Sequence, residues 1–159
     1  MYNSRRFLRF ILNIYPPLLF NRIVLIEISR DFSEMNVIIK KSLFNMNFYK
    51  SIFGGTIFSA CDPYFPIMYY NIFKKRNKKL VIWLKSAKIN YIKPANTNLR
   101  LQFKINKNNI HKIEEDISSK GKSEIWHKIQ AINKDGVPCA EADMLIYLKE
   151  NDKDGKVQF

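Results

Sequence analysis

Residues 47–63 read NFYKSIFGGTIFSACDP, and this stretch decides how the chain is expected to fold. The pair Gly54-Gly55 is followed by small and apolar residues without charge as far as Asp62, which is typical of a buried helix. Pro63 and Pro66 argue against a straight continuation, because an interior proline removes an amide donor and clashes with the preceding turn. We therefore predict a buried helix that kinks just after the aspartate.

The chain before this stretch predicts a short helix and a pair of strands. Ser4 is a suitable cap for a helix that Pro16 and Pro17 end. Residues 22–28 and 36–43 are dense in β-branched side chains, with turn-forming residues between them. The apolar positions of the helix are Phe7, Leu8, Ile11, Leu12 and Tyr15, and the turn residues are Ser29, Asp31 and Ser33.

The chain after this stretch predicts about four more strands. Residues 80–93 form one candidate, and residues 99–106 alternate apolar and polar side chains with a period of two. A helix over 108–120 closes at Gly121, and strands over 124–133 and 137–149 are joined by a turn at Asp135-Gly136. The order favours an α+β fold, in which an antiparallel sheet wraps around one central helix. We expect a single domain over 1–150 and a flexible tail over 151–159.

The composition restricts the class of protein without choosing a function. With 47% hydrophobic and 26% charged residues, the 159-residue chain is globular. The net charge of +13 attracts phosphates, acidic proteins, nucleic acid or anionic lipid headgroups, although abundant Lys, Ile and Asn also fit a biased coding sequence. The basic run at 74–79 lacks interleaved aromatic residues, so no nucleic-acid partner is expected.

Targeting and metal-site signals are weak. The longest apolar stretch, 7–20, is interrupted and shorter than the roughly 20 residues of a bilayer span, so stable membrane insertion is not expected. Cys61 and Cys139 lie far apart without ligand spacing, which predicts buried free thiols, no metal site and a reducing cytoplasm.

The stretch from Asn47 through Phe53-Gly54-Gly55 to Asp62-Pro63 resembles the central-helix motif of hotdog-fold thioesterases. The usual form in that superfamily is an Asn, then His-Gly-Gly, then a carboxylate near the middle of the helix. Phe-Gly-Gly and Asp-Pro are similar to an uncharacterised, domain-of-unknown-function subfamily. Its other landmarks, Tyr15-Pro16-Pro17 and Lys93-Pro94, extend the resemblance over nearly the whole chain.

The resemblance implies a hotdog fold and a site that handles acyl thioesters. A glycine pair lets backbone amides at a helix start approach a ligand, so Gly55 would polarise the thioester carbonyl. Asp62 lies about 10 Å further along the helix. The resemblance resolves this gap by placing the site between two subunits, where Asp62 of one faces the glycines of the other. Asp62 would activate water or attack directly, and Asn47 would position the water or the thioester.

Further expectations follow from the same resemblance. Phe53, Gly54 and Thr56 would contact the substrate, which is an acyl-CoA or acyl-carrier-protein thioester. Coenzyme A enters only as part of that substrate, and no other cofactor is expected. The expected assembly is a homodimer or a dimer of dimers.

Each site residue has a simpler structural interpretation. Gly54-Gly55 alone could make a tight strand-to-helix connection, and Asp62 could cap a helical segment that begins at Pro63. Asn47 could be a turn residue, with Asn45 as a competing register. His111 and His127 have no partner at recognisable spacing, and we expect both to be structural.

Two other functions stay open. Phe53 stands where many hotdog thioesterases carry His, so the chain could be a non-catalytic hotdog protein that binds acyl thioesters or lipids. A basic peripheral membrane or nucleic-acid binder is the third possibility.

Overall fold

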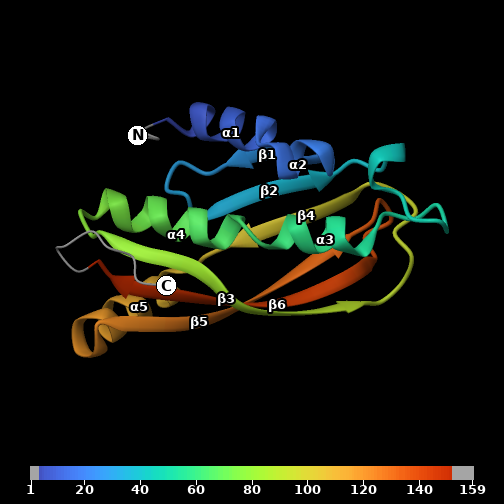
Figure 1. Ribbon diagram of the computed structural model, residues 1–159. Helices are drawn as coiled ribbons and strands as arrows, with labels where there is room; N and C mark the ends of the chain where they lie inside the picture. Colours follow the sequence, from blue (N-terminus) through green and yellow to red (C-terminus); the bar gives the residue numbers. More distant parts are fainter. Residues whose placement is uncertain (1–3, 152–159) are drawn as a thin grey trace.

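The computed structural model describes residues 4–151 (Figure 1). The helices are α1 (Arg5–Ile14), α2 (Pro16–Phe20), the 3-10 helix η1 (Leu43–Asn45), α3 (Gly54–Cys61), α4 (Tyr64–Lys75) and α5 (Lys107–Lys120). The strands are β1 (Ile23–Ile28), β2 (Glu34–Ile39), β3 (Leu80–Tyr91), β4 (Leu99–Lys104), β5 (Lys122–Ile132) and β6 (Pro138–Glu150). Of the predicted tail, residues 152–159 lie outside the described residues.

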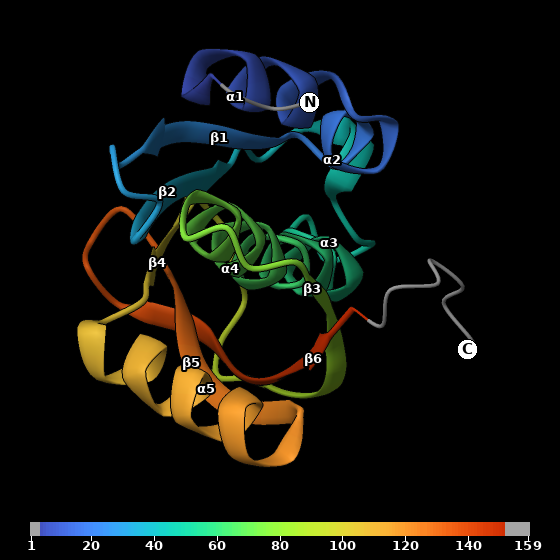
Figure 2. The same ribbon diagram turned by 90° about the vertical axis from the view of Figure 1, so that its left-hand side faces the viewer.

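One antiparallel sheet wraps around the α3–α4 pair, as Figure 2 shows. Its strand order is β1-β2-β4-β5-β6-β3, so β1 and β3 are the two edge strands. Apolar side chains of α3 and α4 pack against the inner face of the sheet, and α5 packs on the outer face of β5. The predicted α+β arrangement of a sheet around a buried helix is confirmed.

The helix pair bends at Asp62-Pro63, where the kink was predicted. α3 ends at Cys61 and α4 begins at Tyr64, with both intervening residues in the right-handed helical region. Pro66 lies in the first turn of α4, where an amide has no acceptor within the helix, so this proline costs no helical hydrogen bond. Pro66 therefore does not interrupt α4.

Helix α1 covers one edge of the sheet. The side chain of Asn13 bonds both the amide and the carbonyl of Leu25, at 2.8 and 3.1 Å, and Arg5 and Arg9 each donate to a further β1 carbonyl. A free strand edge invites pairing with another chain, and these side chains occupy its backbone groups. The β1 edge is thereby closed.

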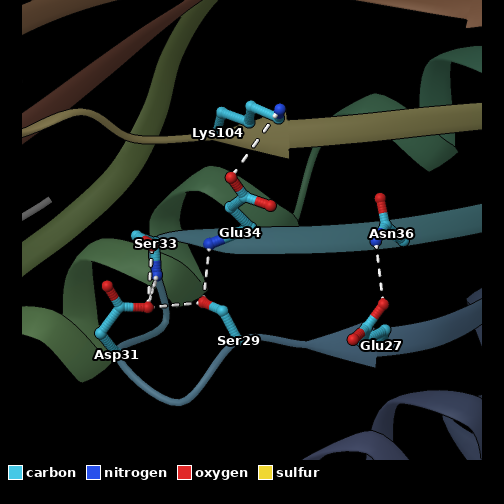
Figure 3. A network of polar contacts seen from close by, with 7 residues as sticks. All are labelled: Glu27, Ser29, Asp31, Ser33, Glu34, Asn36 and Lys104. Atoms are coloured by element: carbon cyan, nitrogen blue, oxygen red, sulfur yellow. Dashed lines mark hydrogen bonds and ion pairs between the residues drawn. The ribbon is translucent and has the colours of Figure 1, made fainter.

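The turn between β1 and β2 uses the predicted residues (Figure 3). Asp31 Oδ1 accepts hydrogen bonds from the hydroxyls of Ser29 at 2.7 Å and Ser33 at 2.8 Å. These bonds favour the ionised carboxylate and lower the pKa of Asp31 to about 2. This turn lies at the opposite end of β1 and β2 from the start of α3 (Figure 1).

Three sequence expectations are corrected in the first 45 residues. Pro16 and Pro17 end α1 but also open α2, because proline at the first helical position is pre-organised for a helix. The second strand ends at Ile39 instead of residue 43, and η1 follows. Of the predicted apolar face of α1, Leu8 and Leu12 are buried, whereas Phe7 and Tyr15 are exposed. Ser4 stands at the N-cap without a side-chain hydrogen bond.

His127 lies in the core between β5 and α4. Its Nε2 is 2.8 Å from the Tyr69 hydroxyl, and its ring stacks on Phe65 at 4.2 Å between centroids. Burial disfavours the charged imidazole and lowers the pKa of His127 to about 4. These contacts give His127 a structural part in the core.

The buried imidazole predicts a loss of stability in mild acid. Unfolding frees His127 to take a proton near its ordinary pKa of 6.5, whereas the folded state resists protonation down to about 4. We expect the free energy of unfolding to fall by about 2 kcal/mol between pH 7 and pH 5. Urea denaturation at both pH values measures this, and His127→Gln should remove most of the difference. An unchanged pH dependence in that variant would contradict the assignment.

Candidate functional site

One face of α3 carries the residues on which the functional prediction rests. Gly55, Ser59 and Asp62 follow one another at helical spacing of four and three residues, so they share a face of the helix. Gly55 and Ser59 are half-buried, and Asp62 is exposed at the surface of the single chain. The predicted glycine and carboxylate therefore lie along the same accessible stripe.

The amides of Gly54 and Gly55 open α3. Phe53 is the N-cap residue, and its carbonyl accepts from the amides of Thr56 at 3.0 Å and Ile57 at 3.3 Å. Within residues 4–151, neither glycine amide has a protein acceptor. An amide at a helix start with no acceptor favours an anionic or carbonyl oxygen.

Two aromatic rings lie where a side chain at either glycine would stand. A Cβ on Gly54 would lie 3.0 Å from Cζ of Tyr91, and a Cβ on Gly55 would overlap Cε1 of Phe53. The Tyr91 hydroxyl also donates to the Gly54 carbonyl at 2.9 Å. The tight connection considered from sequence is thus present, and it still leaves the amides unpaired.

The contact with Tyr91 gives a direct prediction. Gly54→Ala places the new methyl group 3.0 Å from the tyrosine ring, which must shift together with its hydrogen bond to the Gly54 carbonyl, and this should cost about 1 kcal/mol. In a Tyr91→Ala background the same substitution should cost much less, because the obstructing ring is gone. Urea denaturation of the two single variants and the double variant forms the cycle. Equal costs in both backgrounds would exclude the contact.

Asp62 carries a carboxyl whose pKa is raised above its usual value, and the cause is partial burial of the group among neighbouring protein atoms. Its side chain forms no hydrogen bond or ion pair within the described chain. An exposed but partly desolvated carboxylate without a partner is available to a water or a substrate. Cys61 beside it is not a competing nucleophile, because burial raises the pKa of its thiol to about 12.

Asn47 lies in a turn that precedes α3. Its Oδ1 accepts from the amides of Tyr49 and Ser51, and its Nδ2 donates to the Ser51 hydroxyl at 2.8 Å. Asn45 is buried and holds three backbone positions through its side chain. Within one chain both asparagines are occupied by structural bonds, which matches the turn interpretation of Asn47.

Thr56 and Phe53 face different surroundings. The Thr56 hydroxyl is buried and donates to Oδ1 of Asn21 at 2.7 Å. Phe53 is 56% exposed, and its ring lies against Gly55. Of the two predicted substrate contacts, the Phe53 ring is therefore accessible to a ligand, whereas the Thr56 hydroxyl is already hydrogen-bonded inside the chain.

Ser59 and Tyr91 belong to this surface and were not singled out from sequence. The Ser59 hydroxyl donates to the Gly55 carbonyl at 2.9 Å and lies on the stripe between Gly55 and Asp62. The helical spacing of Ser59 from Gly55 and Asp62 could have indicated from sequence that it shares their face. Tyr91 comes from β3, 37 positions after Gly54, and no sequence signal indicates that contact.

The basic run at 74–79 lies at the far end of the helix pair from the glycines (Figure 1). Arg76 bonds Glu114 at 2.9 Å, and Lys75 donates to the Arg30 carbonyl at 2.7 Å. Within one chain this run is therefore remote from Gly55, and two of its basic side chains already bind other residues.

The single chain does not enclose the site. A hollow of about 780 Å³ lies over β2, β4 and the β5–β6 turn, and no α3 residue lines it. Residues 4–151 contain no cluster of His, Cys, Asp or Glu suited to a metal ion, and none of their helices is long and apolar enough to cross a membrane. The stripe on α3 is an open surface that another chain could cover.

Comparison with protein families identifies the family of this chain. The family DUF4442, a domain of unknown function, matches residues 3–148. This chain belongs to the DUF4442 family. No curated protein sequence is detectably similar to it.

Solved structures resemble this DUF4442 protein over almost its whole length. A protein of unknown function from Pseudomonas aeruginosa, described as a probable thioesterase, aligns with a TM-score of 0.79 at 14% identity, covering 93% of this chain and 97% of that one. A protein of unknown function from Chlorobaculum tepidum gives 0.75 at 15%, covering 92% and 94%. A thioesterase from Haemophilus influenzae gives 0.70 at 8%, covering 96% and 95%. The predicted hotdog fold is confirmed.

Proposed function

We propose that this DUF4442 protein hydrolyses acyl thioesters, of coenzyme A or a carrier protein, at a site shared by two subunits. The observation that carries the proposal is the stripe on α3, where an amide without an acceptor at Gly55 and a carboxylate without a partner at Asp62 share one accessible face. The thioesterase descriptions of proteins with the same fold support the choice of substrate class.

The second subunit supplies the geometry that one chain lacks. Within α3, Gly55 and Asp62 are separated by about 10 Å along the helix axis, which is too far for both to contact one carbonyl. A partner related by twofold symmetry brings its own Asp62 opposite Gly55 and creates two equivalent sites. The homodimer and the dimer of dimers both satisfy this requirement.

The free edge of β3 is the place where the subunits would pair. Within residues 4–151, β3 has a single neighbour, β6, along its 12 residues, whereas the other edge strand is covered by α1. Tyr91 ends β3 and contacts Gly54, so an interface along this edge runs past the start of α3. An uncovered strand edge of this length favours pairing with another chain.

The proposed reaction needs only the chain's own groups and water. Asp62 takes a proton from water, and the resulting hydroxide adds to the thioester carbonyl carbon. The amide of Gly55 on the other subunit donates to the oxyanion that forms. The C–S bond then breaks, the proton returns from Asp62 to the thiolate, and a carboxylic acid and a free thiol leave. A direct attack by Asp62 followed by hydrolysis is the alternative route.

A panel of acyl-CoA substrates tests this function. Purified protein is incubated with acyl-CoAs of short, medium and long chains, and the released thiol is followed with a thiol-reactive chromophore. The proposal expects release above the uncatalysed rate for at least one chain length. A lack of release together with measurable acyl-CoA binding would instead support the second candidate function.

That second candidate is an acyl-thioester or lipid-binding protein without turnover. The observation that favours it is the Phe53 ring, which lies against Gly55 where the superfamily's usual histidine would stand. A ring beside the start of α3 narrows the space that a bound carbonyl would need. Phe53→Ala should then increase turnover or ligand affinity, and a decrease in both would count against this view of the ring.

A further inference from the structure

Four large apolar side chains next to α3 are almost completely exposed. Leu43 and Phe44 of η1 are 86% and 81% exposed, and Phe48 and Tyr49 are 106% and 90% exposed. The other large hydrophobic side chains on the described surface reach at most 68%. We call these four residues the aromatic tip, which lies beyond the start of α3 in Figure 1.

Hydrogen bonds and a β-bridge hold the backbone beneath the aromatic tip. A β-bridge between Met46 and Ile52 closes a small hairpin, and the turn bonds of Asn47 hold its end. Asn45 anchors η1 to the Asn21 and Lys40 carbonyls at 2.8 and 3.0 Å. These contacts order the backbone of the tip before any partner binds. Binding through the tip's side chains therefore loses little backbone conformational entropy.

The stretch of sequence that carries the tip holds only positive charges. Residues 35–61 contain Lys40, Lys41 and Lys50 and no Asp or Glu. Lys40 and Lys50 are exposed, and neither forms an ion pair within residues 4–151. Exposed Arg22 follows Asn21, whose carbonyl binds Asn45. A partner with a negative surface is thus favoured.

The shape of the tip distinguishes between negatively charged partners. Its side chains are exposed, and none of them lines the hollow over β2 and β4 or two smaller hollows near α5 and α1. Aromatic and aliphatic side chains flanked by lysines suit the boundary between lipid headgroups and acyl chains, which needs no matching pocket. A tip-to-tip contact between two copies would bring the lysines together and is disfavoured by repulsion.

We propose that the aromatic tip docks this protein on the surface of an anionic lipid bilayer, with the four apolar side chains among the lipids and the lysines on the headgroups. Phe53, which follows the hairpin, donates its amide to the Asn45 carbonyl at 2.8 Å, so the docked face adjoins the start of α3. Docking is independent of the proposed hydrolysis and can be tested without a thioester.

Vesicle flotation of the full chain tests the docking. The vesicles contain phosphatidylcholine alone, or phosphatidylcholine with about 40% phosphatidylglycerol. The wild type should float with the anionic vesicles and not with the neutral ones, and added salt should weaken its binding. The double variant Phe48→Ser/Lys50→Glu should bind at least about tenfold more weakly.

A matched variant at the other end of the molecule controls for general loss of charge and hydrophobicity. Tyr70→Ser/Lys79→Glu also removes one exposed aromatic ring and reverses one lysine, and it should bind as the wild type does. Thermal unfolding confirms that both variants are folded. Equal loss in the two variants, or equal binding to neutral vesicles, would overturn the proposal.

Two other binding partners of the tip would give distinct results. If the tip contacts a second copy, Phe48→Ser/Lys50→Glu should change the oligomeric state in sedimentation velocity, and the wild type should not bind vesicles. If the tip recognises an acidic protein, an acidic acyl carrier protein should bind the wild type in the absence of any vesicle binding. Either result would refute lipid docking.

Discussion

Replacing Asp62 by asparagine is expected to lower acyl-CoA hydrolysis by about 10²–10⁴-fold while the protein stays folded. The amide keeps the size of the carboxylate but cannot accept a proton from water. In the wild type, kcat/KM should rise with pH as Asp62 ionises, and the midpoint should lie above the ordinary aspartate pKa of 3.8, because partial burial raises the pKa of this carboxyl. Steady-state kinetics over a pH series measures both effects.

The same substitution should increase stability at neutral pH. A carboxyl whose folded pKa is raised stabilises the fold in acid, and this contribution is lost as pH rises through the folded pKa. Asparagine avoids that loss, so the variant's gain in the free energy of unfolding should appear above pH 3.8 and grow toward neutrality. Urea denaturation at several pH values checks the direction.

Asp31→Asn is the matched control with the opposite signature. The hydroxyls of Ser29 and Ser33 lower the pKa of Asp31 to about 2, so its carboxylate stabilises the fold above pH 3.8, and that stability disappears as pH falls toward 2. The variant should therefore be less stable than the wild type at neutral pH and keep full activity.

If Asp62→Asn retains wild-type turnover, Asp62 is not the catalytic base.

Replacing Ala87 by proline on β3 is expected to separate the subunits and abolish activity together. The Ile92 amide donates to the Cys139 carbonyl of β6 at 2.8 Å. Because amides in an antiparallel ladder alternate in direction, those of Tyr91, Ile89 and Ala87 face the free edge. Proline at Ala87 removes a donor from that edge without taking a bond from β6.

Sedimentation velocity and the acyl-CoA assay measure the two effects on the same preparation. Ala87→Val keeps the amide and should keep both the assembly and the activity. Circular dichroism verifies that the proline variant retains its sheet. A proline variant that is monomeric and fully active would show that one chain holds a complete site.

The fold was predictable because its signals are local. The uncharged run after Gly55, the period of two in β4 and the turn residues near Asp31 each determine their own element. α2 was missed because two prolines read as a helix stop, although proline is also suited to a helix start. The last part of the predicted second strand was wrong because η1 depends on Asn45, whose partners lie elsewhere in the chain.

The site was only partly predictable for a related reason. Gly55 and Asp62 lie on one short helix, so their spacing is visible in the sequence. The contacts of Tyr91 with Gly54 and of Thr56 with Asn21 join residues 37 and 35 positions apart, and periodicity carries no information about such pairs. The exposure of Phe48 and Tyr49 was likewise hidden, because apolar composition favours burial.

The shared site is tested most directly by mixing two inactive variants. Asp62→Asn removes the carboxylate, and Gly55→Val obstructs the helix start, where a Cβ already meets the Phe53 ring. In a mixed dimer, the intact Gly55 of the first variant faces the intact Asp62 of the second and restores one site of two. After co-refolding at equal amounts, random assortment predicts that about one quarter of wild-type activity returns. No recovery in a preparation shown to contain mixed dimers would contradict a site formed between subunits.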